Sequence, residues 1–214
     1  MRARWRPPRR YAGAVSWIEQ IEDEVATGRL RQAYDRVRGP KGEIDNILAV
    51  HSLRPHTLEA HMALYKNVLH HTSNTLPTWQ LEVIGIHVSA LNGCDYCVDH
   101  HAAGLRRLLV DDERTDAILA ALASGQQEPF DGPMRAMLDY AEQLTLEPAS
   151  VSQDDLAPMR AAGLDDGRIL EVNQVVAYFA YANRTVQGLG VTTAGDVLGL
   201  SPADSDDAGA WGHR

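Results

Sequence analysis

The stretch Glu82–His101, EVIGIHVSALNGCDYCVDHH, holds both cysteines of the 214-residue chain and indicates how the fold is organised. Asn92 and Gly93 divide it, because glycine adopts the left-handed turn that ends a helix without a steric penalty. We therefore predict one helix over Trp79–Leu91 and a second from about Cys94 to Leu109. Both thiols therefore lie in the first turn of the second helix.

The spacing Cys94-x-x-Cys97-x3-His101 places three reactive side chains on one face of that second helix. At about 100° per residue they fall within roughly 60° of one another, on a stripe that packs inward, whereas His100 points off this face. Cys97 and His101 are four residues apart, so their side chains should meet, and the imidazole can take the thiol proton. The unpaired N–H groups of the first turn also favour negative charge. We expect both thiol pKa values to be lowered, and Cys94 to be placed to close a disulfide with Cys97.

Glu82 lies in a helix that is apolar nearly all round, so its carboxylate is predicted to be buried. A buried carboxylate needs a partner. Gly85 and Ser89 share its face and allow another helix to approach closely. We predict that Glu82 binds His101, orients the ring and draws off its proton, in an acid–histidine–thiol chain that activates a nucleophile.

The pattern Glu82-x11-Cys94-x-x-Cys97-x3-His101 resembles the signature of the alkylhydroperoxidase AhpD-like proteins in the carboxymuconolactone decarboxylase superfamily, and most closely the peroxidase-related enzymes. The flanking segments DNILAVHSLRPHTLEAHMALYKNVLH (45–70) and YFAYANRTVQGLGV (178–191) are also similar, and the resemblance covers roughly residues 17–200. It implies that Cys97 reacts with peroxide and Cys94 resolves the product. It also implies a homo-oligomer. Tyr96 departs from the well-studied branch, which has a histidine inside its C-x-x-C.

Together these features predict a thiol-dependent hydroperoxidase or dithiol–disulfide oxidoreductase with catalytic residues Cys97, Cys94, His101 and Glu82. Its partners would be a hydroperoxide and a reducing dithiol of the lipoyl or thioredoxin type, and it would need no haem, flavin or metal. One alternative is a non-redox enzyme like carboxymuconolactone decarboxylase, which should not need both thiols. Another is a non-catalytic helical module in which the same four side chains hold zinc, although structural zinc sites usually draw ligands from separate elements. A third is a pair of small buried cysteines without chemistry.

The rest of the chain reads as one helix after another, with no sustained alternation of apolar and polar residues, so we predict an all-α fold. A single AhpD-like helical domain is expected over residues 14–200. Besides the two helices above, the predicted helices are Val25–Arg38, Ile44–Leu53, Pro55–His71, Asp112–Ser124, Pro133–Leu146, Gln153–Ala161 and Arg168 to about Gln187, the last capped by Asp165 or Asp166.

Both ends of the chain are expected to lack fixed structure. Residues 1–13 hold five arginines and no acid, which is typical of a disordered basic arm, and residues 201–214 are predicted to be a flexible tail. Arg9-Arg10 is similar to a twin-arginine export signal, but acidic residues from Glu19 onward leave no apolar segment behind it.

Composition excludes several classes of function. The formal net charge of −9 argues against non-specific nucleic-acid binding. No segment approaches the roughly 18 uninterrupted apolar residues of a membrane helix. Two cysteines in one C-x-x-C suit a reducing compartment, so a cytoplasmic location is predicted.

The other histidines and several residues of the last helix are expected to have structural rather than catalytic roles. His87 lies about 140° from Glu82 around its helix, outside the relay. Glu171-x11-Asn183 repeats the Glu82–Cys94 spacing, and we attribute this to chance. Surface or capping roles are expected for His51, His56, His61, His70 and His71, although His51 and His56 could instead line the site entrance or a subunit contact. Core or oligomer packing is expected for Tyr178, Phe179 and Tyr181. Asn183 and Arg184 are expected to bind across a subunit interface or to cap the helix.

Overall fold

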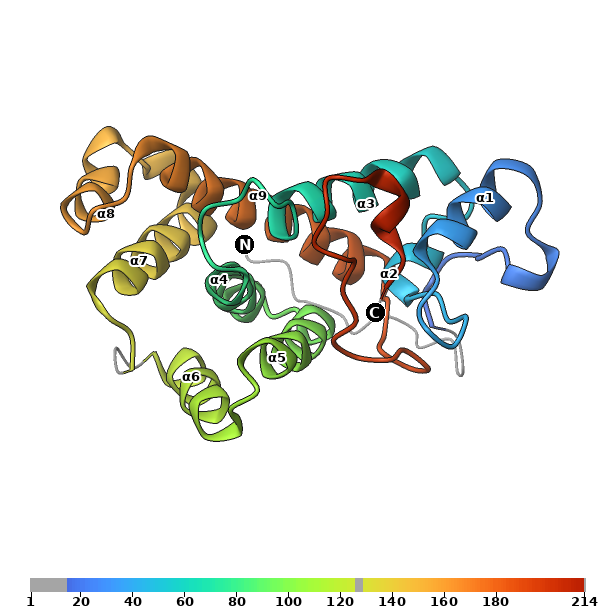
Figure 1. Cartoon of the computed structure of the whole chain (residues 1–214), viewed down its shortest axis with the longest axis horizontal. Coiled ribbons are helices and arrows are strands. Elements are labelled where there is room, and N and C mark those ends of the chain that lie inside the picture. The colour runs from blue at the N-terminus through green and yellow to red at the C-terminus, as the bar shows by residue number, and fades with distance from the viewer. Residues whose placement is uncertain (1–14, 126–128, 214) are drawn as a thin grey trace, which may run out of the picture.

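The computed structural model describes residues 15–125 and 129–213, and every regular element in this part of the chain is helical (Figure 1). The predicted all-α class is confirmed. The arm at residues 1–13 lies outside the described residues. The α-helices are α1 (Gly28–Val37), α2 (Asn46–Ala49), α3 (Pro55–Leu69), α4 (Thr78–Leu91), α5 (Asp95–Leu109), α6 (Asp112–Ser124), α7 (Gly132–Leu146), α8 (Ala157–Ala161) and α9 (Asp166–Leu189), with 3₁₀ turns at Asp23–Val25, Pro148–Ser150, Gln153–Leu156 and Ala208–Trp211.

Local signals explain most helix boundaries. Gly93 adopts φ +66° between α4 and α5, as the glycine argument predicted. Asp165 caps α9 by accepting a hydrogen bond from the Arg168 N–H. The predicted helix Ile44–Leu53 is shorter, because the chain beyond α2 tightens into 3₁₀-type turns and Arg54, which precedes Pro55, is held out of the α region. The predicted helix Gln153–Ala161 is a 3₁₀ turn followed by α8.

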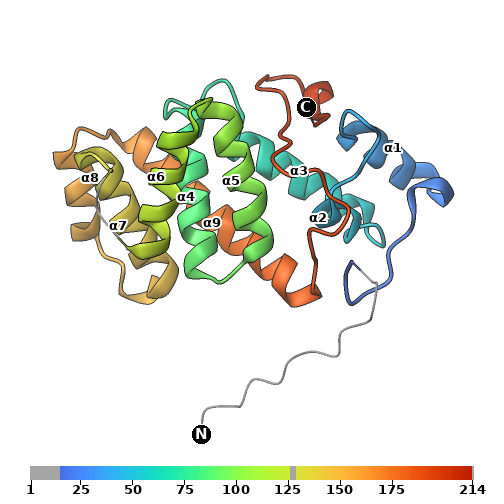
Figure 2. The same ribbon diagram turned by 90° about the horizontal axis from the view of Figure 1, so that it is seen from below.

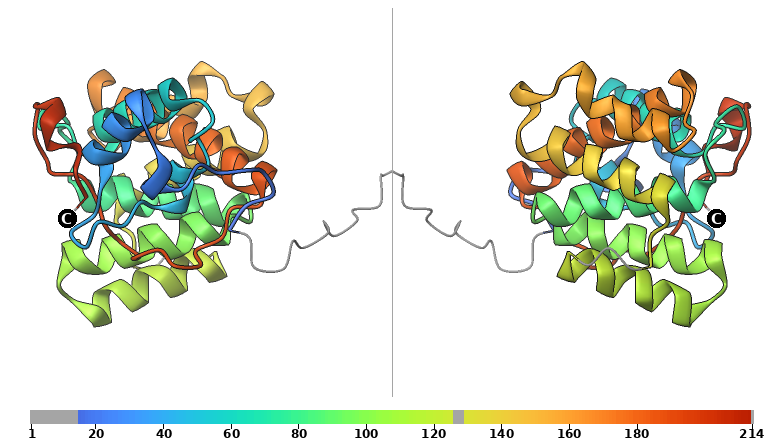
Figure 3. Two further views of the ribbon diagram at one scale, coloured as in Figure 1. Left: turned by 90° about the vertical axis from the view of Figure 1, so that its right-hand side faces the viewer. Right: turned by 90° about the vertical axis from the view of Figure 1, so that its left-hand side faces the viewer.

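Helix α4 is the centre of the bundle. It packs against α5, α7 and α9, and its apolar side chains from Leu81 to Val88 are buried. In the end views of Figure 3, α5 and α6 lie on one side of the bundle and α3 and α9 on the opposite side. Each fully buried aliphatic side chain contributes roughly 1.5–3 kcal/mol, so α4 is held firmly enough to carry Glu82 into the core.

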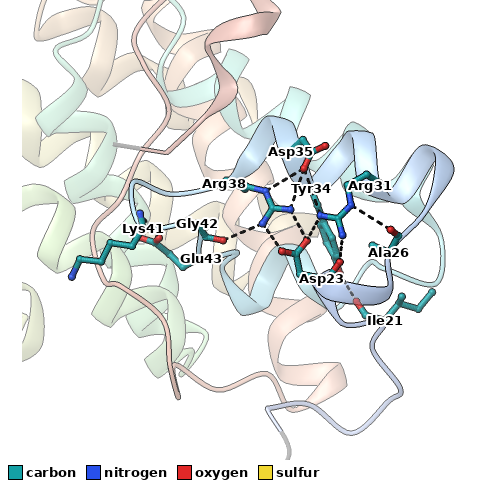
Figure 4. A network of polar contacts seen from close by, with 10 residues as sticks. All are labelled: Ile21, Asp23, Ala26, Arg31, Tyr34, Asp35, Arg38, Lys41, Gly42 and Glu43. Atoms are coloured by element: carbon teal, nitrogen blue, oxygen red, sulfur yellow. Dashed lines mark hydrogen bonds and ion pairs between the residues drawn. The ribbon is translucent and has the colours of Figure 1, made fainter.

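A partly exposed charge cluster joins the segment before α1 to that helix (Figure 4). Asp23 binds both Arg31 and Arg38, and the Arg38 hydrogen bond is the main cause that holds the pKa of Asp23 below its usual range. Tyr34, buried beneath it, donates its hydroxyl hydrogen to the Ile21 carbonyl at 2.9 Å. Exposed ion pairs are worth little individually, so the cluster locates this segment more than it stabilises the fold.

The chain beyond α9 returns across the bundle and runs between α5 and the α1–α3 region (Figure 2). Lys66 of α3 donates to the Asp207 carbonyl, and the His213 N–H donates to the Arg38 carbonyl at 3.2 Å. Residues 201–213, expected as a flexible tail, therefore contact α1 and α3 and place His213 in the interior. No helix in the described part of the chain has both the length and the apolarity needed to cross a bilayer.

Candidate active site

The two thiols lie side by side where α5 begins. Cys94 is the residue that caps α5 and Cys97 lies in its first turn, and their Sγ atoms are 2.9 Å apart. Both are free thiols, with 1% and 3% of their surface exposed. A disulfide measures about 2.05 Å, so a small movement would join the two sulfurs.

The thiol pair releases one proton easily and the second with difficulty. A hydrogen bond from the Cys97 thiol stabilises the Cys94 thiolate and lowers the pKa of Cys94. The same contact, together with burial, raises the pKa of Cys97 well above its usual range. The prediction that both pKa values fall is therefore wrong for Cys97, because two negative sulfurs this close cannot both ionise. Of the two thiols, Cys94 therefore loses its proton before Cys97.

Asn183 of α9 is a neighbour of the thiols that sequence reasoning missed. It is fully buried, donates to Ser89 Oγ at 3.0 Å and accepts a hydrogen bond from Asn92 Nδ2 at 2.9 Å. Its side chain also lowers the pKa of both cysteines. The expected interface or capping role is replaced by one inside the chain. The sequence signal that could have indicated this role is the amide side chain of Asn183 within an otherwise apolar stretch of helix.

The predicted bond between Glu82 and His101 is confirmed. Glu82 Oε2 lies 2.6 Å from His101 Nδ1, and the carboxylate side chain is only 3% exposed. Phe179 stands edge-on to the His101 ring at 4.6 Å between centroids. Because the carboxylate engages Nδ1, the other nitrogen, Nε2, is the one that can exchange a proton with a bound molecule.

The expected direct contact between His101 and Cys97 is not made as a hydrogen bond: within the described residues the imidazole bonds to neither sulfur. The hydrogen bond that the ring does make is the one from Nδ1 to Glu82 of α4. The positive charge that His101 can carry is one of the smaller causes that lower the pKa of Cys94. His101 thus acts on the thiols through space and faces the same cavity as Cys97.

His100 was expected to point away from the interior, and this prediction is wrong. It is buried, its Nε2 lies 3.1 Å from Asp196 Oδ2, and its ring stacks on Tyr96 at 4.5 Å. Asp196 also accepts the Tyr96 hydroxyl hydrogen at 2.7 Å. The loop after α9 covers this face of α5, which no local pattern of α5 could reveal. Tyr96, the departure inside the C-x-x-C, ties α5 to that loop.

A cavity of about 310 Å³ gives the site its access. Cys97, Glu82 and His101 form one wall of it, whereas Cys94 instead borders a separate hollow of about 710 Å³ beside Trp17 and Val191. Gly104 lies next to the Glu82 carboxylate, and a Cβ there would stand 3.8 Å from Glu82 Oε2, an ordinary van der Waals distance. The two sulfurs therefore face different spaces.

Several other predicted assignments can now be placed. His61 is buried in the middle of α3, so the surface or capping role expected for it is wrong, whereas His70 is the C-terminal cap of α3, one of the two roles expected for it. His87 lies apart from the relay, beside Glu142, as predicted. Glu171 accepts hydrogen bonds from the Thr75 and Leu76 N–H groups and so holds the loop before α4. Over the residues described, no three His, Cys, Asp or Glu side chains are grouped as a metal site.

Comparisons with known proteins agree with the fold. Residues 55–130 match the carboxymuconolactone decarboxylase family. A peroxidase-related protein with an alkylhydroperoxidase AhpD core from Ralstonia eutropha JMP134 is 24% identical, with a TM-score of 0.74 over 85% of this chain and 94% of that one. A peroxidase-related protein from Silicibacter sp. TM1040 is 26% identical, with a TM-score of 0.63 over 71% and 77%. The debrominase Bmp8 shares the fold at 19% identity, with a TM-score of 0.66 over 84% and 91%. No protein of curated function matches the sequence.

Proposed function

Taking the chain as an AhpD-like member of the carboxymuconolactone decarboxylase superfamily, we propose that it reduces hydroperoxides with its two thiols. The observation that carries this proposal is the order of groups across the site. A histidine held by a buried carboxylate lines the same cavity as Cys97, and the Cys94 Sγ atom lies 2.9 Å from the Cys97 Sγ atom, outside the lining of that cavity. A peroxide in the cavity would meet the nucleophile and the proton donor together, with the resolving thiol out of its reach.

In the first step the thiol pair gives one proton to His101 Nε2, and Glu82 stabilises the imidazolium. The remaining proton moves from Cys97 to Cys94 across the 2.9 Å contact, so the charge reaches the sulfur that faces the cavity. The Cys97 thiolate attacks the distal peroxide oxygen, and the O–O bond breaks. His101 returns its proton to the departing alkoxide, which leaves as an alcohol, and Cys97 becomes a sulfenic acid.

In the second step Cys94 attacks the sulfenic sulfur. The Cys94–Cys97 bond forms, the S–O bond breaks, and the thiol proton leaves with the hydroxyl as water. Overall, two thiols and one hydroperoxide give a disulfide, an alcohol and water. An external dithiol of the lipoyl or thioredoxin type then restores both thiols by exchange. The hollow that borders Cys94 supports attack by this reductant on Cys94, with Cys97 as the leaving thiolate.

The test is peroxide-dependent oxidation of a dithiol by wild type, Cys97→Ser and His101→Gln. Cys97→Ser should be inactive, and His101→Gln should lose about 10²–10⁴-fold in kcat/KM, the usual contribution of a positioned acid–base group. His87→Gln is the matched control, since this histidine is also part-buried but lies in another part of the bundle. Unchanged turnover in both site variants would refute the mechanism.

A mass measurement isolates the chemical steps. One equivalent of peroxide should remove two hydrogen atoms from the reduced wild type. In Cys94→Ser it should add one oxygen to Cys97 as a sulfenic acid that a dimedone probe traps. A non-redox decarboxylase would keep its activity in Cys94→Ser and show no such mass change, which would decide for that alternative.

A further inference from the structure

One part of the cavity lining, called the polar end below, contains buried polar atoms that make no hydrogen bond. His61 is 3% exposed, and its Nδ1 has no hydrogen-bond partner among the described residues. Both ring nitrogens of His213 are in the same state, although Nδ1 lies 3.2 Å from Asp45 Oδ2, at an angle that makes no hydrogen bond. His61, His213 and Asp45 all line the cavity.

Such atoms are costly to leave unpaired. A buried donor or acceptor without a partner costs about 1–3 kcal/mol, and native structures contain few of them. Here they come from two separate elements, the middle of α3 and the C-terminal segment, and the buried Asp45 carboxylate before α2 lines the same cavity. Their convergence on one cavity points to a bound molecule that completes their hydrogen bonds.

A wall of rings connects this polar end to the reaction centre. The Tyr65 ring stands 6.3 Å from the His101 ring, 5.7 Å from that of Tyr178 and 6.5 Å from that of His213, centroid to centroid. Tyr178 in turn lies 5.8 Å from His61. The polar end is therefore about two ring contacts from His101, a span that a compact aromatic or alicyclic body would fill. The volume of about 310 Å³ is at the low end of the roughly 300–1,000 Å³ of small-molecule sites.

The charges at the polar end select a neutral group. Burial lowers the pKa of His61 to about 3, so its imidazole is uncharged at neutral pH. Asp45 is buried 3.2 Å from His213 Nδ1 and would repel an anionic head group. Arg107 also lines the cavity, but it is exposed and its guanidinium donates to the Leu198 carbonyl at 3.1 Å. A hydroxyl group, which donates to the carboxylate or an imidazole nitrogen and accepts from a ring N–H, fits this set.

We propose that His61, His213 and Asp45 form a subsite for a neutral hydroxyl group at one end of a compact ring-containing ligand, whose other end lies at Cys97 and His101. The identity of the ligand as a substrate rests on the proposed peroxidase function, and with that function the substrate class is a hydroxylated aromatic or alicyclic hydroperoxide. The subsite itself can be tested without any peroxide.

The experiment compares two probes that differ by one hydroxyl oxygen, 4-isopropylbenzyl alcohol and 4-isopropyltoluene, by equilibrium dialysis against the reduced full chain. Wild type should bind the alcohol about 5- to 10-fold more tightly, the value of one net hydrogen bond of about 1–1.4 kcal/mol. His61→Phe and His213→Phe should each reduce this preference to about 2-fold or less. His213→Phe changes a residue outside the helices, so it keeps the test valid if His61→Phe unfolds.

His87→Phe is the matched control, because its two ring nitrogens are also buried without hydrogen bonds but it lines a different cavity. It should keep the full preference for the alcohol. Equal binding of both probes by wild type would overturn the proposal, since water would then satisfy the polar end. A preference that survives both subsite variants would overturn it as well. If the preference appears but peroxide is not turned over, the subsite stands and the proposed function fails.

Discussion

The close approach of α4 and α9 at Gly85 should control activity more than stability. A Cβ added at Gly85 would overlap the Phe179 ring, and the Phe179 ring stands edge-on to His101 at 4.6 Å. Gly85→Ala therefore displaces a ring that supports the proposed acid–base group. Glu82 lies one helical turn before Gly85, so the same change also disturbs the part of α4 that positions Glu82 for its bond to His101.

The magnitude follows from the overlap. The added Cβ would lie 2.9 Å from Phe179 Cδ2 and closer still to two other ring atoms. Restoring a separation of about 3.5 Å requires a retreat of at least about 0.6 Å for Cδ2 and more for the nearer atoms. Overpacking of this kind costs about 1–3 kcal/mol, and alanine returns about 1 kcal/mol of helix propensity. The net loss is about 0–2 kcal/mol, while a misplacement approaching 1 Å can cost about 10²-fold in rate.

The assay pairs thermal unfolding with kcat/KM for cumene hydroperoxide, using dithiothreitol as reductant. Gly188→Ala is the control, because this helical glycine of α9 has open space where its Cβ would stand. It should keep full activity and gain up to about 1 kcal/mol of stability. The double variant Gly85→Ala/Phe179→Leu should recover part of the stability lost by the single variant, since the two side chains are in contact.

Full activity in Gly85→Ala, with a melting temperature equal to or above that of wild type, would refute the reasoning. It would mean that Phe179 moves freely and that His101 does not depend on it.

Three further predictions concern single polar groups. Glu82→Gln removes the charge that stabilises the His101 imidazolium and should lower kcat/KM about 10²–10⁴-fold with the thermal unfolding temperature little changed; a loss below 10-fold would contradict the relay. Asn183→Leu should raise the pKa of both thiols, because the Asn183 hydrogen bonds lower them, and thiolate absorbance at 240 nm against pH measures this; an unchanged titration would contradict the assignment. Acid should destabilise the fold through His61, whose folded pKa of about 3 lies below its unfolded value of about 6.5. The contribution of neutral His61 to the free energy of unfolding is complete above pH 6.5 and is lost as pH falls toward 3. The loss between pH 7 and pH 4.5 is about 3 kcal/mol. The free energy of unfolding of His61→Phe, measured with urea, should therefore fall by correspondingly less than that of wild type over this range.

Local signals in the sequence determined the central helices and the core of the site. Helix α4 is apolar all round, so its burial and that of Glu82 follow from its composition alone. The left-handed turn at Gly93 and the one-turn spacing of Cys94 and Cys97 place both thiols at the start of α5. The pairing of Glu82 with His101 could be predicted because a buried carboxylate demands a partner and His101 shares the helix face of the two cysteines.

Only the tertiary structure decided which groups act on which. The opposite pKa shifts of the two thiols depend on a sulfur–sulfur distance of 2.9 Å, which a spacing of three residues permits but does not require. His100 is buried because Asp196, 96 residues later in the chain, comes to meet it. Asn183 reaches the thiols only because α9 packs on α4. His213 enters the cavity through contacts with α1 and α3 that lie more than a hundred residues away.

The physical reason for this division is the range of the forces. Helix geometry, glycine turns and the cost of burying a charge act within a few residues or on a side chain by itself, so they can be read along the chain. Proton sharing, hydrogen-bond partners and the walls of a cavity depend on distances between segments that the sequence separates. The sequence therefore determined the reactive groups of this protein, and packing decided their partners.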